Sequence, residues 1–201
     1  MKIEYIIGLS GYVGSGKDAT AAILARYGYH RFAFADLLRK ELSEWWKEGP
    51  IQVPVPQGVQ YTLAALKVDE PYRSRIWQKP TTAAIRDALQ FWGTDYKRWK
   101  HPRYWVDKLL KEIEEKDGPP GRIVISDMRY PNEYDMVKAY QGRCWRIERG
   151  SPVNNHTSEI ALDFHEFDAY IQNSGTLEEL ERRVDRILHS YDTEARLLKE
   201  T

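Results

Sequence analysis

The stretch IIGLSGYVGSGKD, residues 6–18, decides the fold of this chain. An apolar run leads into it and predicts a buried strand, and Ala19–Tyr27 continues it with a pattern typical of a helix. Between them Gly11, Gly16 and Lys17 have the G-x-x-x-x-G-K spacing of a P-loop. Glycines allow successive N–H groups to turn toward one anion, and the helix N-terminus adds partial positive charge. This order of strand, loop and helix predicts a phosphate-binding site.

The two residues that end the motif suggest how a nucleotide is held. Lys17 is long enough to reach the outer phosphates of a nucleoside triphosphate, so we expect such a nucleotide as the ligand. Asp18 stands where most P-loops carry the Ser or Thr that binds Mg²⁺. Its carboxylate can hold Mg²⁺ through a water molecule or orient the acceptor phosphate, and the sequence leaves both roles open. The loop residues expected to contact the nucleotide are Gly11, Val13, Gly14, Ser15, Gly16, Lys17, Asp18 and Ala19.

Length and composition narrow the class of protein. The chain has 201 residues, which favours one domain, and its 30 Lys and Arg balance its 30 Asp and Glu. A net charge of zero argues against a general nucleic-acid binder, which normally carries a basic excess. The single cysteine, Cys144, forms no internal disulfide and lies in an apolar alternation, so we expect a buried structural thiol. Without a membrane-length apolar run or a signal peptide, we expect a cytoplasmic enzyme that does not bind membranes.

Strand and helix patterns alternate along the chain. The segments expected to form strands are Tyr5–Leu9, Arg31–Phe34, Arg122–Ser126, Arg143–Glu148 and Ala169–Gln172. The segments with helical periodicity are Leu37–Trp46 with Asp36 as its N-cap, Thr81–Asp95, Tyr104–Lys116, and the residues after the capping box Thr176-x-x-Glu179. This alternation predicts the α/β class, with a parallel sheet and crossover helices.

A second candidate site lies at the end of the strand expected at residues 122–126. Asp127 follows that apolar strand directly, where a carboxylate can hold Mg²⁺ or its waters, and Arg129 can bind a phosphate through its planar guanidinium. The alternative is that Asp127 forms a turn and Arg129 is a surface charge. Asn132 is expected to cap the following helix, and the role of Glu133 is left open.

A third candidate lies on the helix expected at residues 81–95. Arg86 and Gln90 are four residues apart and so share one helix face, where a guanidinium and an amide suit an acceptor with a phosphate and a base edge. A turn is expected at residues 93–95. From the spacing alone, an amphipathic core helix with a solvated Arg86 is the favoured interpretation.

Five elements in chain order resemble the bacteriophage deoxynucleoside monophosphate kinases, and the resemblance covers nearly the whole chain. They are SGKD (15–18), the helix with Arg39, QFWGTDYKR (90–98) with Trp105 behind it, SDMRYPNE (126–133) with HTSE (156–159) behind it, and QNSGTLEEL (172–180). P-loop phosphomevalonate kinases carry a similar first loop. The resemblance implies a P-loop NTPase fold, three-layer α/β/α with a five-stranded parallel sheet, like that of nucleoside monophosphate kinases.

The same resemblance implies the reaction and its residues. It implies transfer of the γ-phosphoryl group of ATP to a deoxynucleoside monophosphate, with Lys17, Asp18, Asp127 and Arg129 as catalytic residues and Mg²⁺ held through water by Asp18 and Asp127. On the ATP side it adds Arg149, with Arg146 as a second candidate, Asn173 and Gly175. On the acceptor side it implies Asp36, Arg39, Arg86, Gln90, Thr94, Asp95, Arg98, Arg129, Glu133, His156 and Glu159. Residues 47–80 are expected to cover the acceptor, and residues 149–157 to form a lid.

Three alternatives stay open at this point. One is another P-loop kinase, for phosphomevalonate or dephospho-coenzyme A. The second is a P-loop ATPase that works with nucleic acid, against which the zero net charge counts. The third is a nucleotide-binding protein without catalysis, although Lys17 and Asp127 are both present. A homodimer is also left open, and the location would be the host cytoplasm if a phage encodes the chain.

Overall fold

The computed structural model describes residues 5–45, 76–78, 81–116, 121–150 and 160–197. The chain forms two compact units. Unit 1 combines Met1–Ala33 with Leu110–Thr201, and unit 2 is Phe34–Leu109. Most of the expected acceptor cover at 47–80 and lid at 149–157 lies outside the described residues, as do His156 and Glu159.

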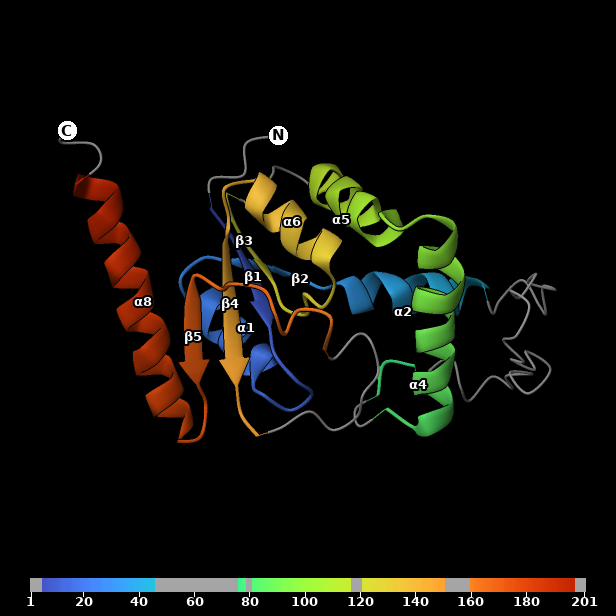
Figure 1. Cartoon of the computed structure of the whole chain (residues 1–201), viewed down its shortest axis with the longest axis horizontal. Helices are drawn as coiled ribbons and strands as arrows, with labels where there is room; N and C mark the ends of the chain where they lie inside the picture. Colours follow the sequence, from blue (N-terminus) through green and yellow to red (C-terminus); the bar gives the residue numbers. More distant parts are fainter. Residues whose placement is uncertain (1–4, 46–75, 79–80, 117–120, 151–159, 198–201) are drawn as a thin grey trace. The chain divides into compact units, whose positions relative to one another are not determined.

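Unit 1 is built on one five-stranded sheet in which each neighbouring pair of strands is parallel (Figure 1). The strands are β1 (Tyr5–Ser10), β2 (His30–Phe32), β3 (Arg122–Ile125), β4 (Arg143–Glu148) and β5 (Ala169–Gln172). Their order in the sheet is β2-β3-β1-β4-β5. The prediction of a five-stranded parallel sheet is therefore confirmed, and the α/β class with it.

Helices cover both faces of this sheet. Alternate residues of β1 show this, because Ile7 and Leu9 join a buried cluster with Leu24 of α1 (Lys17–Arg26) and Val184 of α8 (Leu177–Leu197). Gly8 points to the opposite face, where a Cβ would lie 2.8 Å from Met128 Sδ and 3.0 Å from a methyl of Val137 in α6 (Pro131–Ala139). Unit 1 thus has the three layers that the sequence predicts, with α1 and α8 on one face and α6 on the other (Figure 1).

The strand order fixes where a ligand is expected. β1 lies in the middle of the sheet, with β3 on one side and β4 on the other. β2 and β3 lie on one side of β1 in the sheet, and β4 and β5, which come later in the chain, lie on the other side. Such a switch in order opens a ligand site beyond the carboxyl ends of the strands. The loop after β1 begins at this point.

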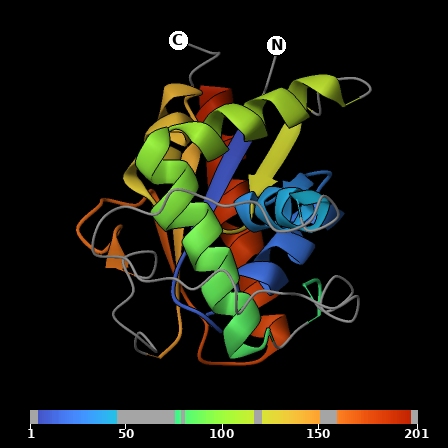
Figure 2. The same ribbon diagram turned by 90° about the vertical axis from the view of Figure 1, so that its right-hand side faces the viewer.

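Unit 2 is helical. It contains α2 (Phe34–Trp45), α4 (Ala83–Gln90) and η2 (Phe91–Arg98), a π-helix, and α5 (Tyr104–Glu115) begins in it. Figure 2 shows α4 and η2 as one continuous helix. The turn expected at residues 93–95 is therefore wrong, because the backbone widens into π-helical hydrogen bonds there and does not leave the helix.

Two expected helix caps are also wrong. Helix α2 begins at Phe34, so Asp36 lies in its first turn, where a carboxylate favours the helix dipole, and is not the N-cap. Helix α6 is preceded by Tyr130 and begins at Pro131, so Asn132 is its second residue. The capping box of α8 is confirmed, with Thr176 N–H donating to Glu179 Oε2 and Glu179 N–H to Thr176 Oγ1, both at 3.2 Å. None of the helices in the described part of the chain is long and apolar enough to cross a membrane.

Candidate active site

The P-loop runs from the end of β1 to the start of α1 and depends on glycine at two positions. Gly11 has φ 141°, and a Cβ there would lie 2.3 Å from the carbonyl oxygen of Ile147. Gly16 has φ 104°, and a Cβ there would lie 2.1 Å from Asn173 Nδ2. A side chain at either residue would meet both backbone strain and a close neighbour. The glycines of the motif are therefore required by this loop conformation itself.

Lys17 is the first residue of α1 and is buried against the loop. Its Nζ donates to the carbonyl oxygen of Gly11 at 2.6 Å and to that of Tyr12 at 2.8 Å. The N–H of Ser15 also donates to Tyr12 O, at 3.1 Å. The ammonium group is thus bonded to carbonyl groups of the loop that it follows, and its contact with phosphate stays a prediction. Ser15 is fully buried, whereas Val13 and Gly14 are exposed on the loop surface.

The two expected magnesium carboxylates differ in exposure. Asp18 lies exposed in the first turn of α1, and Asp127 is buried just after β3. The residues on either side of Asp127 are bonded to neighbouring strand ends, since Met128 N–H donates to Leu9 O and Ser126 N–H donates to Phe32 O, both at 3.0 Å. Asp127 therefore stands beside the end of the P-loop strand, as predicted. In the described parts of the chain, no three His, Cys, Asp or Glu side chains form a group that could hold a metal.

Glu133 holds the backbone that carries Arg129. Its carboxylate oxygen Oε2 accepts the main-chain N–H of Arg129 at 2.6 Å and that of Tyr130 at 3.1 Å. Glu133 is 1% exposed, and Arg129 is half-buried. Glu133 thus fixes the loop between β3 and α6, a role that its position three residues into the helix makes clear.

Asn173 follows β5, and its side chain is hydrogen-bonded to the P-loop. Its Nδ2 donates to the carbonyl oxygen of Ser15 at 2.8 Å, and its N–H donates to Glu148 O at 2.8 Å. The side chain is buried, with its donor directed into the loop. Gly175 leaves room for the capping box, because a Cβ there would lie 1.5 Å from Glu179 Oε2. The structure therefore brings the QNSGTLEEL segment against the P-loop.

The two candidate lid arginines lie in different surroundings. Arg149 is exposed just after β4, followed by Gly150 with φ 68°. Arg146 lies inside β4, where it pairs in register with Ser10, the last residue of β1. Its side chain is 9% exposed and bonds to Ser10 and Asp163. Arg146 therefore belongs to the base of the P-loop.

In unit 2, the expected acceptor residues lie on three helices. In α2, Arg39 lies 3.8 Å from Asp36 Oδ1, and its Nε donates to the carbonyl oxygen of Ile76 at 3.1 Å. In α4, Arg86 is exposed and Gln90 is half-buried. Thr94, Asp95 and Arg98 are half-buried in η2. The segment QFWGTDYKR is thus largely a π-helix, a rare element that is frequent at functional sites.

A carboxylate that sequence reasoning missed, Glu41, organises unit 2. Its Oε1 accepts the indole N–H of Trp92 at 3.0 Å and pairs with Lys97 at 2.8 Å. Its Oε2 accepts the hydroxyl of Tyr104 at 2.6 Å and also pairs with Lys108. These partners are 51 to 67 residues away in the chain, so no local pattern marks Glu41.

The charges around Glu41 set its protonation. Burial by itself raises the pKa of Glu41, but the bonds from Lys108, Lys97 and Tyr104 outweigh it, so the pKa is lowered. Burial and the bond to Glu41 raise the pKa of Tyr104 to about 12. Lys97 Nζ also lies 4.8 Å from the ring centre of Trp92 and 4.6 Å from that of Tyr104. Glu41 is therefore an ionised anchor that ties α2 to η2 and α5.

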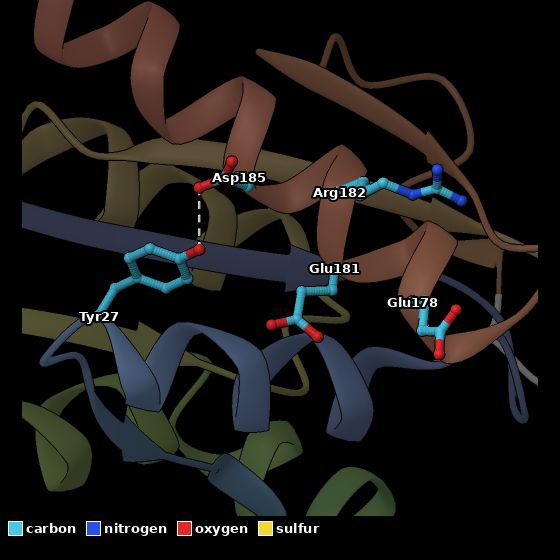
Figure 3. Close-up of a pocket in the computed structure, with 5 residues that line it drawn as sticks. All are labelled: Tyr27, Glu178, Glu181, Arg182 and Asp185. Carbon is cyan, nitrogen blue, oxygen red and sulfur yellow. Dashed lines mark hydrogen bonds between the residues drawn. The ribbon is translucent and has the colours of Figure 1, made fainter.

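A shallow depression of about 490 Å³ lies between the end of α1 and α8. It is lined by Tyr27, Glu178, Glu181, Arg182 and Asp185, and Figure 3 shows Tyr27 directed toward Asp185. The Tyr27 hydroxyl donates to Asp185 Oδ1 at 2.9 Å. None of the site residues predicted from the sequence lines this depression.

Comparisons with known proteins agree with the expected family. A family model described as deoxynucleotide monophosphate kinase matches residues 52–184, which begin after the P-loop, so the loop geometry and this match are independent observations. A protein of Acanthamoeba polyphaga mimivirus, provisionally named deoxynucleotide monophosphate kinase, is 29% identical over 199 residues, covering 87% of this chain and 91% of the viral protein. The deoxynucleotide monophosphate kinase of Escherichia phage RB69 is 28% identical over 132 residues, covering 64% of this chain and 54% of the phage protein. Among solved structures, TT1252 from Thermus thermophilus has a TM-score of 0.49 at 18% identity, covering 94% of this chain and 98% of that one.

Proposed function

The chain belongs to the deoxynucleotide monophosphate kinase family, and from that premise we propose which residues carry out its reaction. It is a phosphotransferase that phosphorylates deoxynucleoside monophosphates. The observation that supports the residue assignment most directly is the P-loop at the end of the central strand, with Lys17 held over it. The loop and the strand order support a nucleotide-binding site, and the family match supports the activity.

On the donor side, the loop residues and Lys17 bind the β- and γ-phosphates of ATP. Loop N–H groups and the N-terminus of α1 favour an anion, and the Lys17 ammonium neutralises part of its charge. Asn173 serves the donor by fixing the carbonyl of Ser15. Arg149 is exposed beside this end of the sheet and is the proposed arginine that closes over the triphosphate.

Asp18 and Asp127 fit a magnesium ion held through water. Both are carboxylates, the ligand type that Mg²⁺ prefers, and Mg²⁺ normally keeps several waters beside one or two carboxylates and substrate phosphates. A site with few protein ligands agrees with the lack of a three-residue cluster in the described parts of the chain. Bound Mg²⁺ would neutralise charge that develops on the transferred phosphoryl group.

On the acceptor side, Arg39, Arg86 and Arg129 bind the monophosphate, and Gln90 binds the base edge. An oxygen of the acceptor phosphate forms the new bond to the γ-phosphorus while the bond from that phosphorus to the β–γ bridging oxygen breaks. The products are ADP and a deoxynucleoside diphosphate. Because the attacking oxygen is already ionised near pH 7, the residues have to align and neutralise the two phosphates, and no general base is required. Asp36, Thr94, Asp95, Arg98, His156 and Glu159 complete the proposed acceptor set, and Glu133 serves it by holding the main chain of Arg129.

An acceptor panel with Lys17→Ala tests this proposal. The wild-type chain is assayed for ADP formation with each common nucleoside monophosphate in ribo and deoxy form, with phosphomevalonate, with dephospho-coenzyme A and with DNA. We expect transfer to deoxynucleoside monophosphates, and loss of about a thousandfold or more in Lys17→Ala, because the ammonium stabilises transition-state charge. The control Lys111→Ala removes an exposed lysine and should keep full activity. Full activity in Lys17→Ala, or ADP formation that depends on DNA alone, would contradict the proposal.

A further inference from the structure

Three side chains outside the assigned machinery meet beside the P-loop. The hydroxyl of Tyr12, a loop residue, donates to Asp163 Oδ2 at 2.9 Å. Arg146 of β4 donates from Nη2 to Asp163 Oδ1 at 2.6 Å and from Nη1 to Ser10 Oγ at 3.3 Å. The guanidinium also lies 4.7 Å from the ring centre of Tyr12 and 5.6 Å from that of Phe167. Asp163 is thus bonded on one oxygen to the loop and on the other to the strand beside it.

The cluster is constrained by charge. A guanidinium that is 9% exposed needs a counter-charge, because desolvation without one is costly. Asp163 supplies that charge with a short, charge-assisted bond. The ion pair therefore holds the Asp163 carboxylate in the place where its second oxygen meets Tyr12. Burial and the bond to Asp163 raise the pKa of Tyr12, so its hydroxyl keeps the proton that it donates.

Tyr12 is also one of the two residues whose main chain binds Lys17, the other being Gly11. The carbonyl oxygen of Tyr12 accepts from Lys17 Nζ at 2.8 Å and from Ser15 N–H at 3.1 Å. Tyr12 therefore contributes to holding both the lysine and the turn of the loop through its backbone, while its side chain is bonded to Asp163. Three hydrogen bonds thus link Arg146 to Asp163, Asp163 to the side chain of Tyr12, and the main chain of Tyr12 to Lys17.

We propose that Asp163 is a positioning residue for the donor site, which orients Lys17 through the side chain of Tyr12, with Arg146 holding Asp163 in place. The inference rests on the proposed donor role of the P-loop and adds two side chains that act on ATP binding, that of Tyr12 at a variable position of the glycine motif and that of Asp163 outside it. Loss of the Tyr12–Asp163 bond lets the loop and Lys17 sample other orientations, so the affinity for MgATP falls.

The chain contains a matched control for this bond. Tyr27 donates to Asp185 Oδ1 at 2.9 Å, the same chemistry and the same length, in the same unit but at the other end of α1 (Figure 3). Tyr27→Phe removes this tyrosine–carboxylate bond without touching the P-loop. A merely structural role for Tyr12 predicts that Tyr12→Phe behaves like Tyr27→Phe. The proposed role predicts that the two variants differ in nucleotide binding.

The experiment measures MgATP dissociation constants by calorimetry and thermal unfolding for Tyr12→Phe, Asp163→Ala, the double variant, Tyr27→Phe and Lys17→Ala. We expect Tyr12→Phe to weaken MgATP binding about tenfold, the effect of losing a hydrogen bond to a charged group, while Tyr27→Phe stays within about twofold of wild type. Adding Tyr12→Phe to Asp163→Ala should change the constant less than about twofold further, because the shared bond is already lost. In transfer assays the KM for ATP should rise and the KM for the monophosphate should not.

Each result has a defined meaning. The proposal is overturned if Tyr12→Phe and Tyr27→Phe bind MgATP equally well, or if the effects of Tyr12→Phe and Asp163→Ala multiply fully in the double variant. If Asp163→Ala fails to fold, the pair Tyr12→Phe and Tyr27→Phe still decides. Lys17→Ala distinguishes failure of the proposed donor site from failure of the positioning role. If Lys17→Ala binds MgATP as well as wild type, the donor site is refuted, and this proposal with it. Loss of binding there, with Tyr12→Phe like its control, refutes the positioning role alone.

Discussion

Arg129 provides the test of the acceptor side at the scale of a single residue. Its main chain is fixed by the buried Glu133, so a substitution changes the side chain with little effect on the loop. Arg129→Lys keeps the charge but loses the planar pair of donors that matches a phosphate. We expect a fall of about tenfold in kcat/KM for the monophosphate, with the KM for ATP within about twofold, measured by steady-state kinetics.

A matched substitution controls for the loss of an arginine as such. Arg103 is exposed and pairs with Asp107 one helical turn away, so Arg103→Lys should leave both constants unchanged. If Arg129→Lys instead raised the KM for ATP and spared the monophosphate, Arg129 would belong to the donor site.

Sequence reasoning predicted the position in the fold of residues that a local pattern marks, while their roles stay predictions. Lys17 and Asp127 were predicted from the glycine motif and from a strand that ends in a carboxylate, and both stand where expected. Asp163 carries no such pattern, because its partner Tyr12 is 151 residues away. Polar contacts of this kind follow from the packed fold, and one sequence does not reveal which side chains it brings together.

Glu41 provides the test at the scale of the element. Glu41 lies in α2, is 12% exposed and accepts hydrogen bonds from side chains of η2 and α5. Glu41→Gln keeps the shape but removes the charge that pairs with two lysines, so we expect a loss of about 2 kcal/mol in the free energy of unfolding at pH 7, measured by urea titration. The matched control is Glu115→Gln, which breaks an exposed ion pair with Lys111 and should cost about 0.5 kcal/mol or less.

The difference in the free energy of unfolding between wild type and Glu41→Gln should also depend on pH, in a direction set by the pKa of Glu41. The folded pKa of Glu41 lies below its usual 4.5, so the stabilisation is complete above that value and is lost as the pH falls through the folded pKa. The stability gap between wild type and Glu41→Gln should therefore be constant above about pH 5.5 and shrink below pH 4.5. A gap that grew on acidification would show that Glu41 is not the ionised anchor.

Elements with a strong apolar pattern were predicted well. β4 and β5 have the predicted bounds, and β1, β2 and β3 differ by one or two residues, because buried parallel strands appear as short apolar runs. The starts of α2 and α6 were predicted less well. Helix α2 begins at Phe34 and the N-cap of α6 is Tyr130, and aromatic residues are unusual at these positions. The π-helix was missed because it depends on packing: Trp105 Nε1 donates to Gly93 O at 2.9 Å, and Leu38 fills the space beside Gly93.

Reactivity of the Cys144 thiol provides the test at the scale of the whole molecule, because it reports unfolding. Cys144 is fully buried in β4, and burial raises its pKa to about 12, so the reactive thiolate is rare at pH 8. We expect no alkylation by iodoacetamide in the folded protein, and labelling in urea with the same midpoint as the loss of far-ultraviolet circular dichroism. Because the chain has one cysteine, each label is one unfolding event. Labelling well before the circular dichroism change would show that the β4 region opens on its own.

Unit 1 is made of two segments that are separated in the chain by unit 2, and this affects the order in which the protein can fold during synthesis. β1 obtains its neighbours from β3 and β4, and Ser10 pairs with Arg146, 136 residues later. Unit 2, by contrast, is one continuous segment, Phe34–Leu109. A ribosome thus synthesises every residue of unit 2 before it makes the strands that complete the sheet around β1. The nucleotide loop is translated before unit 2 but acquires its native surroundings only after β3 and β4 have been made, so the nascent chain becomes able to bind ATP only then.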